Sequence, residues 1–131
     1  IKTKNIIVYG ESLGTAIATK LSTNYTFNTT ILEAPFTSVA DIAQKKYWIF
    51  AAKYLVLDDF DIIGIIEKIN SPLLIIHGYK DYVINVTFGK KIFKAAPNPK
   101  KALFIQNAGH NNLFEFNIVN KISNFLEKYR N

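Results

Sequence analysis

The sequence predicts an α/β fold in which about four parallel strands are flanked by helices. Short, nearly continuous apolar runs alternate with longer segments in which apolar residues recur at helical spacing. Such runs are typical of parallel strands that helices cover on both faces. The four runs span residues 6–9, 30–32, 73–76 and 103–105, and Gly, Pro or Asn follows each within a few residues.

Three amphipathic segments are the predicted helices between and after these strands. The first follows Gly10 and ends around Asn24, the second ends at Pro97, and the third occupies the end of the chain. Residues 36–70 are predicted to be a helical lid or insert, with a short helix before Pro72. The apolar faces comprise Ala16, Ile17 and Leu21; Phe88, Ile92, Phe93 and Ala96; and Ile118, Val119, Ile122, Phe125, Leu126 and Tyr129, with Ile62, Ile63, Ile66 and Ile69 in the short helix.

Composition excludes several classes of function. The 131 residues suit a single domain, and 49% hydrophobic residues with 20% charged residues argue against disorder. No apolar run is long enough to span a bilayer, and no signal-peptide pattern is present, so a cytoplasmic location is expected. The net charge of +6 comes from scattered lysines, with Arg130 the single arginine, which predicts a solvated surface and no nucleic-acid partner. Without cysteine there are no disulfides or thiolate metal sites, and neither a metal nor an organic cofactor is expected.

A serine between two glycines follows the first predicted strand. The run Gly10-Glu11-Ser12-Leu13-Gly14 matches the G-x-S-x-G nucleophile elbow, in which a sharp turn lifts the serine hydroxyl above the sheet. Gly10 and Gly14 would leave room for that turn and for a close approach of helix to strand. The backbone N–H of Leu13, at the helix start, would face an oxyanion.

An acid and a histidine follow the third and fourth predicted strands. Asp81 comes just after the third strand and His110 just after the fourth. Ser12, Asp81 and His110 therefore stand in the order Ser, Asp, His, each at the carboxyl end of a parallel strand, where α/β sheets place their sites. His110 would take the serine proton and then protonate the leaving group, and Asp81 would orient the imidazole.

Structural roles for the same residues remain open at this point. Ser12 is also a common type of helix N-cap, and Asp81 could cap the turn into the next helix. His77 precedes Asp81, which breaks the expected order, so it is predicted to be a packed, hydrogen-bonded histidine. Glu11 could influence the pocket or lie on the surface. Asp58, Asp59 and Asp61 are predicted to be capping and solvated charges, with Asp61 as the N-cap, and Tyr47, Trp48, Phe50 and Tyr54 either roof an acyl pocket or belong to the core.

These pieces together resemble the C-terminal half of an α/β-hydrolase. The resemblance is to the serine-hydrolase branch that contains protein depalmitoylases, lysophospholipid lipases and serine aminopeptidase-like proteins. Asn85 is a departure, near a position where relatives often have proline. The matching runs are GESLG (10–14), LEAPFTS (32–38), INSPLLIIHG (69–78), DYV (81–83) and AGHN (108–111).

The resemblance implies a serine hydrolase of ester, thioester or amide bonds that works through an acyl-enzyme. It also implies upstream strands, and a loop with a second oxyanion donor, that this sequence does not contain. With no methionine, the chain is expected to be the C-terminal piece of such a domain, from an AT-rich bacterial or parasite genome. The strand from Ile6 to Tyr9 would then have an open apolar edge, which predicts a homodimer or an N-terminal partner. The alternative is a truncated, non-catalytic half-domain that is inert or acts only in association.

Overall fold

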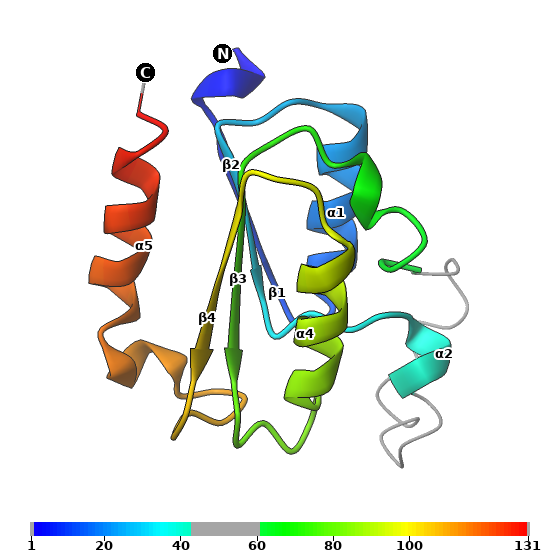
Figure 1. The fold of residues 1–131 in the computed structure, drawn as a ribbon, viewed down its shortest axis with the longest axis vertical. Helices are drawn as coiled ribbons and strands as arrows, with labels where there is room; N and C mark the ends of the chain where they lie inside the picture. Colours follow the sequence, from blue (N-terminus) through cyan, green and yellow to red (C-terminus); the bar gives the residue numbers. More distant parts are fainter. Residues whose placement is uncertain (1, 43–60, 131) are drawn as a thin grey trace.

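Four parallel strands form one sheet with the order β1-β2-β3-β4. The computed structural model describes residues 2–42 and 61–130. The strands are β1 (Ile7–Glu11), β2 (Thr29–Glu33), β3 (Leu73–Gly78) and β4 (Lys100–Ile105), and their carboxyl ends meet at one edge of the sheet (Figure 1). The predicted fold class is confirmed. The first strand begins one residue later than predicted, and all four strands extend beyond the apolar runs.

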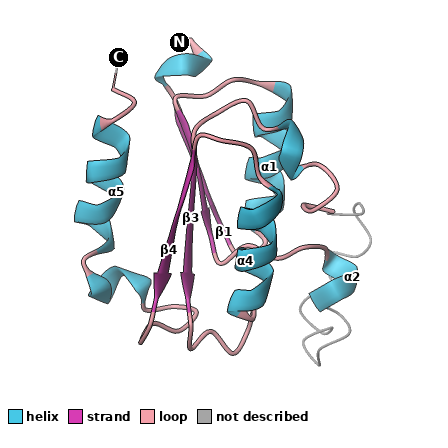
Figure 2. Ribbon diagram, in the orientation of Figure 1, coloured by secondary structure: helices cyan, strands magenta, loops and turns pink. Residues whose placement is uncertain are grey.

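Helices cover both faces of this sheet, as Figures 1 and 2 show. Helices α1 (Gly14–Asn24) and α4 (Val86–Ala95) lie on one face, and α5 (Ile118–Glu127) lies on the other. Asn85, the departure noted above, caps α4 by accepting a 3.0 Å hydrogen bond from the amide of Thr87. The short elements are η1 (Thr3–Asn5), α2 (Val39–Ile42), η3 (Ile66–Lys68) and η4 (Leu113–Phe116).

The core consists of two apolar layers, one on each face of the sheet. Every residue of β2 and β3 is buried, because these two strands are paired on both sides. Alternate side chains of a strand point to opposite faces, so Ile75 contributes to the layer under α1 and α4, and Ile76 to the layer under α5. The near-continuous apolar runs thus mark the two central strands.

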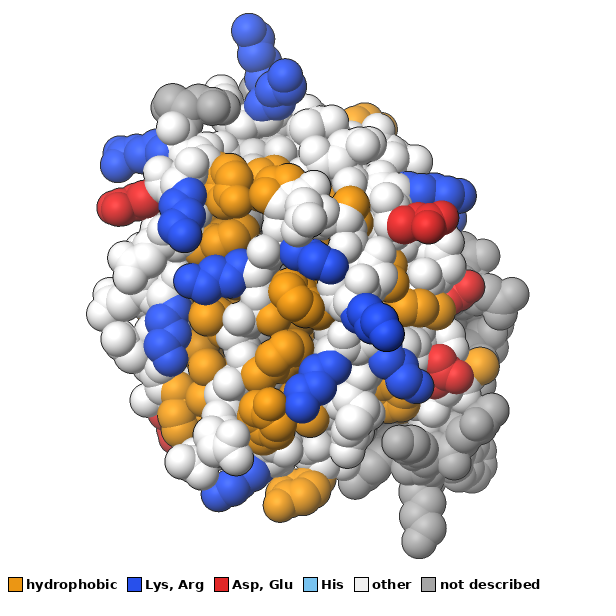
Figure 3. Space-filling view, in the orientation of Figure 1, with side chains coloured by type: hydrophobic (Ala, Val, Ile, Leu, Met, Phe, Trp, Pro, Cys, Tyr) orange, Lys and Arg blue, Asp and Glu red, His pale blue; other side chains and the backbone are white. Residues whose placement is uncertain are grey.

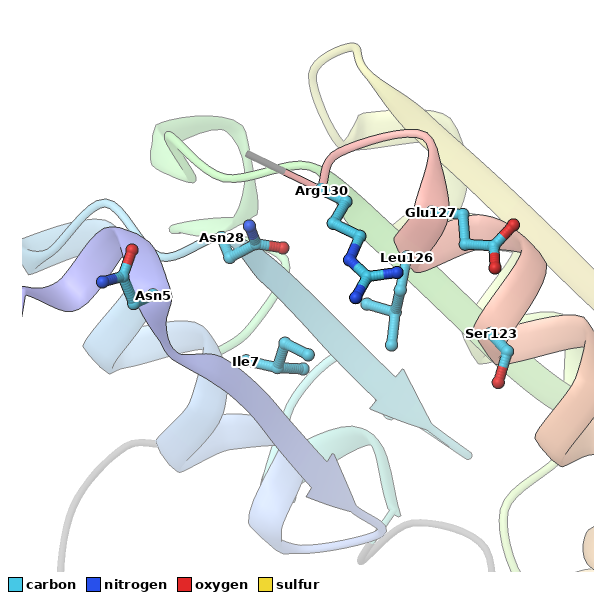
Figure 4. A pocket seen from close by; sticks show the side chains of 7 residues that line it. All are labelled: Asn5, Ile7, Asn28, Ser123, Leu126, Glu127 and Arg130. Atoms are coloured by element: carbon cyan, nitrogen blue, oxygen red, sulfur yellow. The ribbon is translucent and has the colours of Figure 1, made fainter.

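Strand β1 lies at an edge of the sheet, and its side chains are less covered. Ile6, Ile7 and Tyr9 are 36%, 45% and 40% exposed. A hollow of about 400 Å³ lies between this strand and α5, with Ile7 and Leu126 at its wall (Figure 4). Figure 3 shows lysines spread among apolar side chains on one face of the molecule, in keeping with the scattered charge in the sequence.

The predicted helical insert at 36–70 is described only at its two ends. Helix α2 lies at one end and η3 at the other, so the helix predicted before Pro72 is a three-residue 3₁₀ turn. The prediction of Asp61 as a helix N-cap is wrong, because the N-cap residue of η3 is Ile65. The Oδ1 of Asp61 instead caps a turn, where it accepts a 3.0 Å hydrogen bond from the amide of Gly64. Tyr47, Trp48, Phe50, Tyr54, Asp58 and Asp59 lie outside the described residues, so the lid remains a prediction. Within the described ranges, no helix has the length and hydrophobicity needed to cross a membrane.

Candidate functional site

Ser12 lies on a sharp turn between β1 and α1. Its φ of 50° is in the left-handed region, which side-chain-bearing residues adopt only under constraint. The Ser12 amide donates to the carbonyl of Glu33 at 2.8 Å, and its own carbonyl accepts from the amide and hydroxyl of Thr15 at 3.0 and 2.5 Å. The half-buried Ser12 hydroxyl has no hydrogen bond to any described residue. Because the N-cap residue of α1 is Leu13, without a side-chain cap, the reading of Ser12 as a plain N-cap is wrong.

The two elbow glycines, Gly10 and Gly14, differ in how much space surrounds them. A Cβ on Gly10 would lie 2.5 Å from the carbonyl oxygen of Gly14 and 2.7 Å from the Cβ of Ala18. The close approach of α1 to β1 therefore requires a glycine at position 10, as predicted. A Cβ on Gly14 would meet nothing within 4 Å among the described atoms, so packing places no such demand there.

The amide of Leu13 stands free at the start of α1. It donates to no acceptor within residues 2–42 and 61–130. The N-terminus of a helix carries partial positive charge and unpaired N–H groups, which favour an anion. The local geometry therefore suits the oxyanion role predicted for this amide.

Asp81 is the acid that the structure joins to His110. The carboxylate is buried, with 2% of the residue exposed, in the turn after β3. Its Oδ1 accepts hydrogen bonds from the amides of Val83 and Ile84 at 2.9 and 2.7 Å, and its Oδ2 lies 2.7 Å from Nδ1 of His110. Asp81 thus caps its own turn and contacts the histidine, so the two roles weighed for it coexist on separate oxygens.

The loops that carry the acid and the histidine are joined through their backbones. The amide of Lys80 donates to the carbonyl of Ala108 at 2.9 Å. A Cβ on Gly78 would lie 2.2 Å from that same carbonyl oxygen, so only glycine permits this approach. His110 lies two residues after Ala108 and keeps 13% of its side chain exposed. The Asp81–His110 contact is therefore set by the close packing of two strand ends.

The charges of this pair shift the pKa of each partner. Burial alone would raise the pKa of Asp81, but hydrogen bonds from His110, His77 and the Ile84 amide outweigh it and hold that pKa well below the usual range. The hydrogen bond to Asp81 raises the pKa of His110, against the opposing effect of burial. The pair therefore favours an ionised acid beside a histidine that readily accepts a proton.

Two further polar groups lie buried at this end of the sheet. The carboxyl of Glu33 is hydrogen-bonded to the hydroxyl of Tyr9, and burial raises the pKa of both groups. Sequence reasoning gave Glu33 no role, although an acidic residue in an apolar strand run was the available signal. His77 is fully buried and hydrogen-bonded through Nε2 to the carbonyl of Ile84, in agreement with the packed role predicted for it.

The arrangement brings two of the three predicted residues into contact. Asp81 and His110 are hydrogen-bonded, whereas Ser12 stands at the end of β1 and its hydroxyl has no hydrogen bond to His110 in the structure. Catalytic hydrogen bonds are often long or unformed without substrate. Glu11, beside the serine, is exposed. No group of three or more potential metal ligands is present among the residues that the structure describes.

Among curated proteins, the chain is similar to alpha/beta hydrolase domain-containing proteins. No protein-family model matches the chain. Human alpha/beta hydrolase domain-containing protein 17B is 37% identical over 116 residues, and mouse alpha/beta hydrolase domain-containing protein 17C is 33% identical over 113 residues. These alignments cover 86% of this chain in both cases, but 38% and 34% of the relatives. The chain therefore spans little more than a third of their length.

Solved structures resemble the fold over nearly the whole chain. An acylaminoacyl peptidase from Pyrococcus horikoshii has a TM-score of 0.76 at 13% identity, covering 98% of this chain and 24% of that one. The esterase domain of a Rhodothermus marinus protein has a TM-score of 0.69 at 16% identity, covering 88% and 56%. Acetyl xylan esterase 1 from Thermoanaerobacterium has a TM-score of 0.74 at 17% identity, covering 100% and 47%. At these sequence identities, the structural similarity shows a shared fold only.

Proposed function

We propose that this chain, which has part of an α/β-hydrolase fold, carries the catalytic residues of a serine hydrolase. The observation that supports this most is the 2.7 Å contact between Asp81 Oδ2 and His110 Nδ1, at the sheet edge where Ser12 occupies a strained turn. Serine needs a base to become a nucleophile, and a histidine oriented by a buried carboxylate is such a base. No other pair of described residues combines a buried acid with a partly exposed histidine.

The proposed mechanism follows from the atoms at the carboxyl ends of the strands. Nδ1 of His110 holds its proton toward Asp81, which leaves Nε2 free to take the proton of the Ser12 hydroxyl as its oxygen attacks an acyl carbon. The oxyanion that forms would be bound by the Leu13 amide. The imidazolium then protonates the leaving group, and an acyl ester remains on Ser12. Water attacks this ester, His110 takes the water proton, and the returned proton releases the free serine and the acid.

The proposed chemistry favours an acyl compound as substrate. An ester, a thioester and an amide all have a carbonyl carbon that this arrangement can attack. Esterases and a peptidase are among the structures that share the fold, and both classes act on such carbons. The finer choice depends on pocket walls that a fold does not specify.

Covalent labelling tests this proposal directly. A fluorophosphonate probe should label the folded chain at Ser12, and the Ser12→Ala variant should not be labelled. Ser22→Ala is the matched control, because Ser22 is a buried serine of α1 that is hydrogen-bonded to Thr30 and remote from the proposed chemistry. Absence of labelling on folded protein, or equal labelling of Ser12→Ala, would favour the alternative of a non-catalytic association module.

The partner proposal concerns the open edge of β1. This strand pairs with β2 on one side and with no described strand on the other, and Ile6, Ile7 and Tyr9 in and beside it are between one third and one half exposed. An exposed apolar strand edge is a template for another strand, so a second copy or an N-terminal segment would pair there. Sedimentation tests this, because a clean monomer at high concentration contradicts self-pairing. The Ser12 amide is hydrogen-bonded to β2, so by alternation the N–H of Ile7 faces the open side of β1. Ile7→Pro, which removes that N–H, should weaken any dimer that forms.

A further inference from the structure

His77 is a fully buried histidine that the proposed mechanism does not use. It lies on β3, four residues before Asp81, with none of its side chain exposed. Its Nε2 lies 2.8 Å from the carbonyl oxygen of Ile84 and 3.4 Å from Oδ2 of Asp81. A buried polar side chain that lies this close to Asp81, the proposed orienting acid, calls for an explanation.

The surroundings of the ring determine which nitrogen carries the proton. Nε2 faces a carbonyl oxygen and a carboxylate oxygen, and both are acceptors, so the proton belongs on Nε2. Nδ1 has no hydrogen-bond partner among the described residues. It lies against Gly89 of α4, where an added Cβ would come within 2.4 Å of it. The His77 ring is thus held with Nε2 as a hydrogen-bond donor and with Nδ1 packed against the backbone of Gly89.

This donor completes a clamp on the peptide units of Ile84. The Ile84 amide donates to Oδ1 of Asp81 at 2.7 Å, while the Ile84 carbonyl accepts from Nε2 of His77 at 2.8 Å. The turn that follows the acid is therefore closed by Asp81 at one point and by the ring at the other. Because the turn occupies Oδ1, the remaining oxygen, Oδ2, is directed to Nδ1 of His110.

We propose that His77 is a positioning residue for the acid of the site: its Nε2–H holds the carbonyl of Ile84 and, more weakly, Oδ2 of Asp81, and so keeps the 2.7 Å contact to His110. The inference rests on the proposed function for its catalytic meaning, but the geometry can be tested without turnover. The other charged groups that act on His110 are Glu11 at the end of β1 and Glu33 at the end of β2, and both stay unchanged in the experiment below.

The first measurement is made on the unaltered chain. Nitrogen-15 NMR of the histidine rings at pH 8 should show a protonated Nε2 and an unprotonated Nδ1 for His77. It should show the opposite tautomer for His110, with a strongly downfield Nδ1 proton from the bond to Asp81. A His77 ring with its proton on Nδ1 would overturn the proposal, whatever the catalytic activity.

A pair of substitutions separates the donor from the volume of the ring. His77→Gln can place an amide N–H near the position of Nε2, whereas His77→Leu fills similar space without a donor. The downfield His110 proton and the raised pKa of His110 should persist in the Gln variant. In the Leu variant the proton signal should be lost, and the pKa of His110 should fall back toward its ordinary value of 6.5.

Turnover of a small ester adds the catalytic readout. The Leu variant should lose about 10- to 100-fold in kcat with KM changed less than about twofold, because a small displacement of a catalytic group weakens the transition state more than binding. The Gln variant should keep most of its activity. A Leu variant that matches the Gln variant in both kcat and the titration of His110 would overturn the proposal.

Two safeguards keep the outcome decisive. If His77→Leu does not fold, Gly89→Ala displaces the same ring by pushing on Nδ1, and the same loss of the downfield His110 proton is expected. If the unaltered chain is not labelled by fluorophosphonate, the proposed function fails. The tautomer of His77 and the titration of His110 in the variants still decide whether the ring positions the acid.

Discussion

Asp81→Asn perturbs the proposed site through the two oxygens of one side chain. Oδ1 accepts from two backbone amides, at 2.9 and 2.7 Å, so the turn needs an acceptor at that position. In the variant, the amide oxygen would take the place of Oδ1, and its NH₂ group would face Nδ1 of His110. That nitrogen would then have to accept a hydrogen bond, which moves the ring proton to Nε2. His110 could no longer take a proton from Ser12.

The expected loss is large because the wrong tautomer removes the base. A triad whose acid becomes an amide loses about 10⁴ in kcat, which corresponds to about 5 kcal/mol of transition-state stabilisation. Burst and steady-state hydrolysis of a p-nitrophenyl ester measures this loss, and circular dichroism checks the fold. The geometry of the turn should survive, since an Asn oxygen still accepts the two amide bonds.

Asp61→Asn is the matched control for this substitution. Its carboxylate also caps a turn, by accepting the amide of Gly64, but it contacts no histidine. We expect activity within about twofold of the unaltered chain, since surface substitutions away from special features have small effects. If Asp81→Asn retained activity within tenfold while remaining folded, the assignment of Asp81 as the orienting acid would be refuted.

Three further predictions concern titration, packing and core volume. Because Asp81 raises the pKa of His110, and the base must be neutral, kcat/KM should begin to fall with decreasing pH at a value above 6.5, and a pH–rate profile locates this limb. Gly10→Ala should destabilise the fold by about 1–3 kcal/mol in urea unfolding, because its Cβ would meet α1, whereas Gly14→Ala should change stability by less than about 1 kcal/mol. Ile92→Ala, in the fully buried face of α4, should cost about 2–5 kcal/mol, visible as a lower Tm.

The sequence predicted the central part of the fold better than its margins. Strands β2 and β3 are buried on both faces, so their apolar runs are unbroken and easily recognised. Strand β4 starts earlier than predicted, at Lys100. A charged lysine does not suggest a strand, but the ammonium group of Lys100 is hydrogen-bonded to backbone carbonyls that lie near it only in the folded chain. Its Nζ donates to the carbonyls of Phe93 and Ala96, at 2.6 and 2.7 Å, at the end of α4. Such a contact depends on the tertiary fold.

The candidate site was predictable to the extent that strand ends converge. Ser12, Asp81 and His110 could be named because carboxyl ends of parallel strands lie at one edge, which is a rule of topology. The pairing of Glu33 with Tyr9 could not, because it joins neighbouring strands through side chains whose register no sequence pattern specifies. The motif likewise gives a residue type but not the space around it: no described atom lies within 4 Å of a Cβ placed at position 14, so the role of Gly14 stays a prediction.

The two halves of the site have unequal structural support. The acid and the histidine follow β3 and β4, which pair over six residues, and their loops share further backbone hydrogen bonds. Ser12 follows β1, which pairs with β2 alone among the described strands, and a single backbone bond to Glu33 ties its amide to the sheet. The Asp81–His110 pair is therefore held within this chain, whereas the serine turn rests on a strand that is paired on one side only among the described residues. If a second polypeptide pairs with the open side of β1, as proposed above, it would act on the nucleophile before it acts on the acid and base.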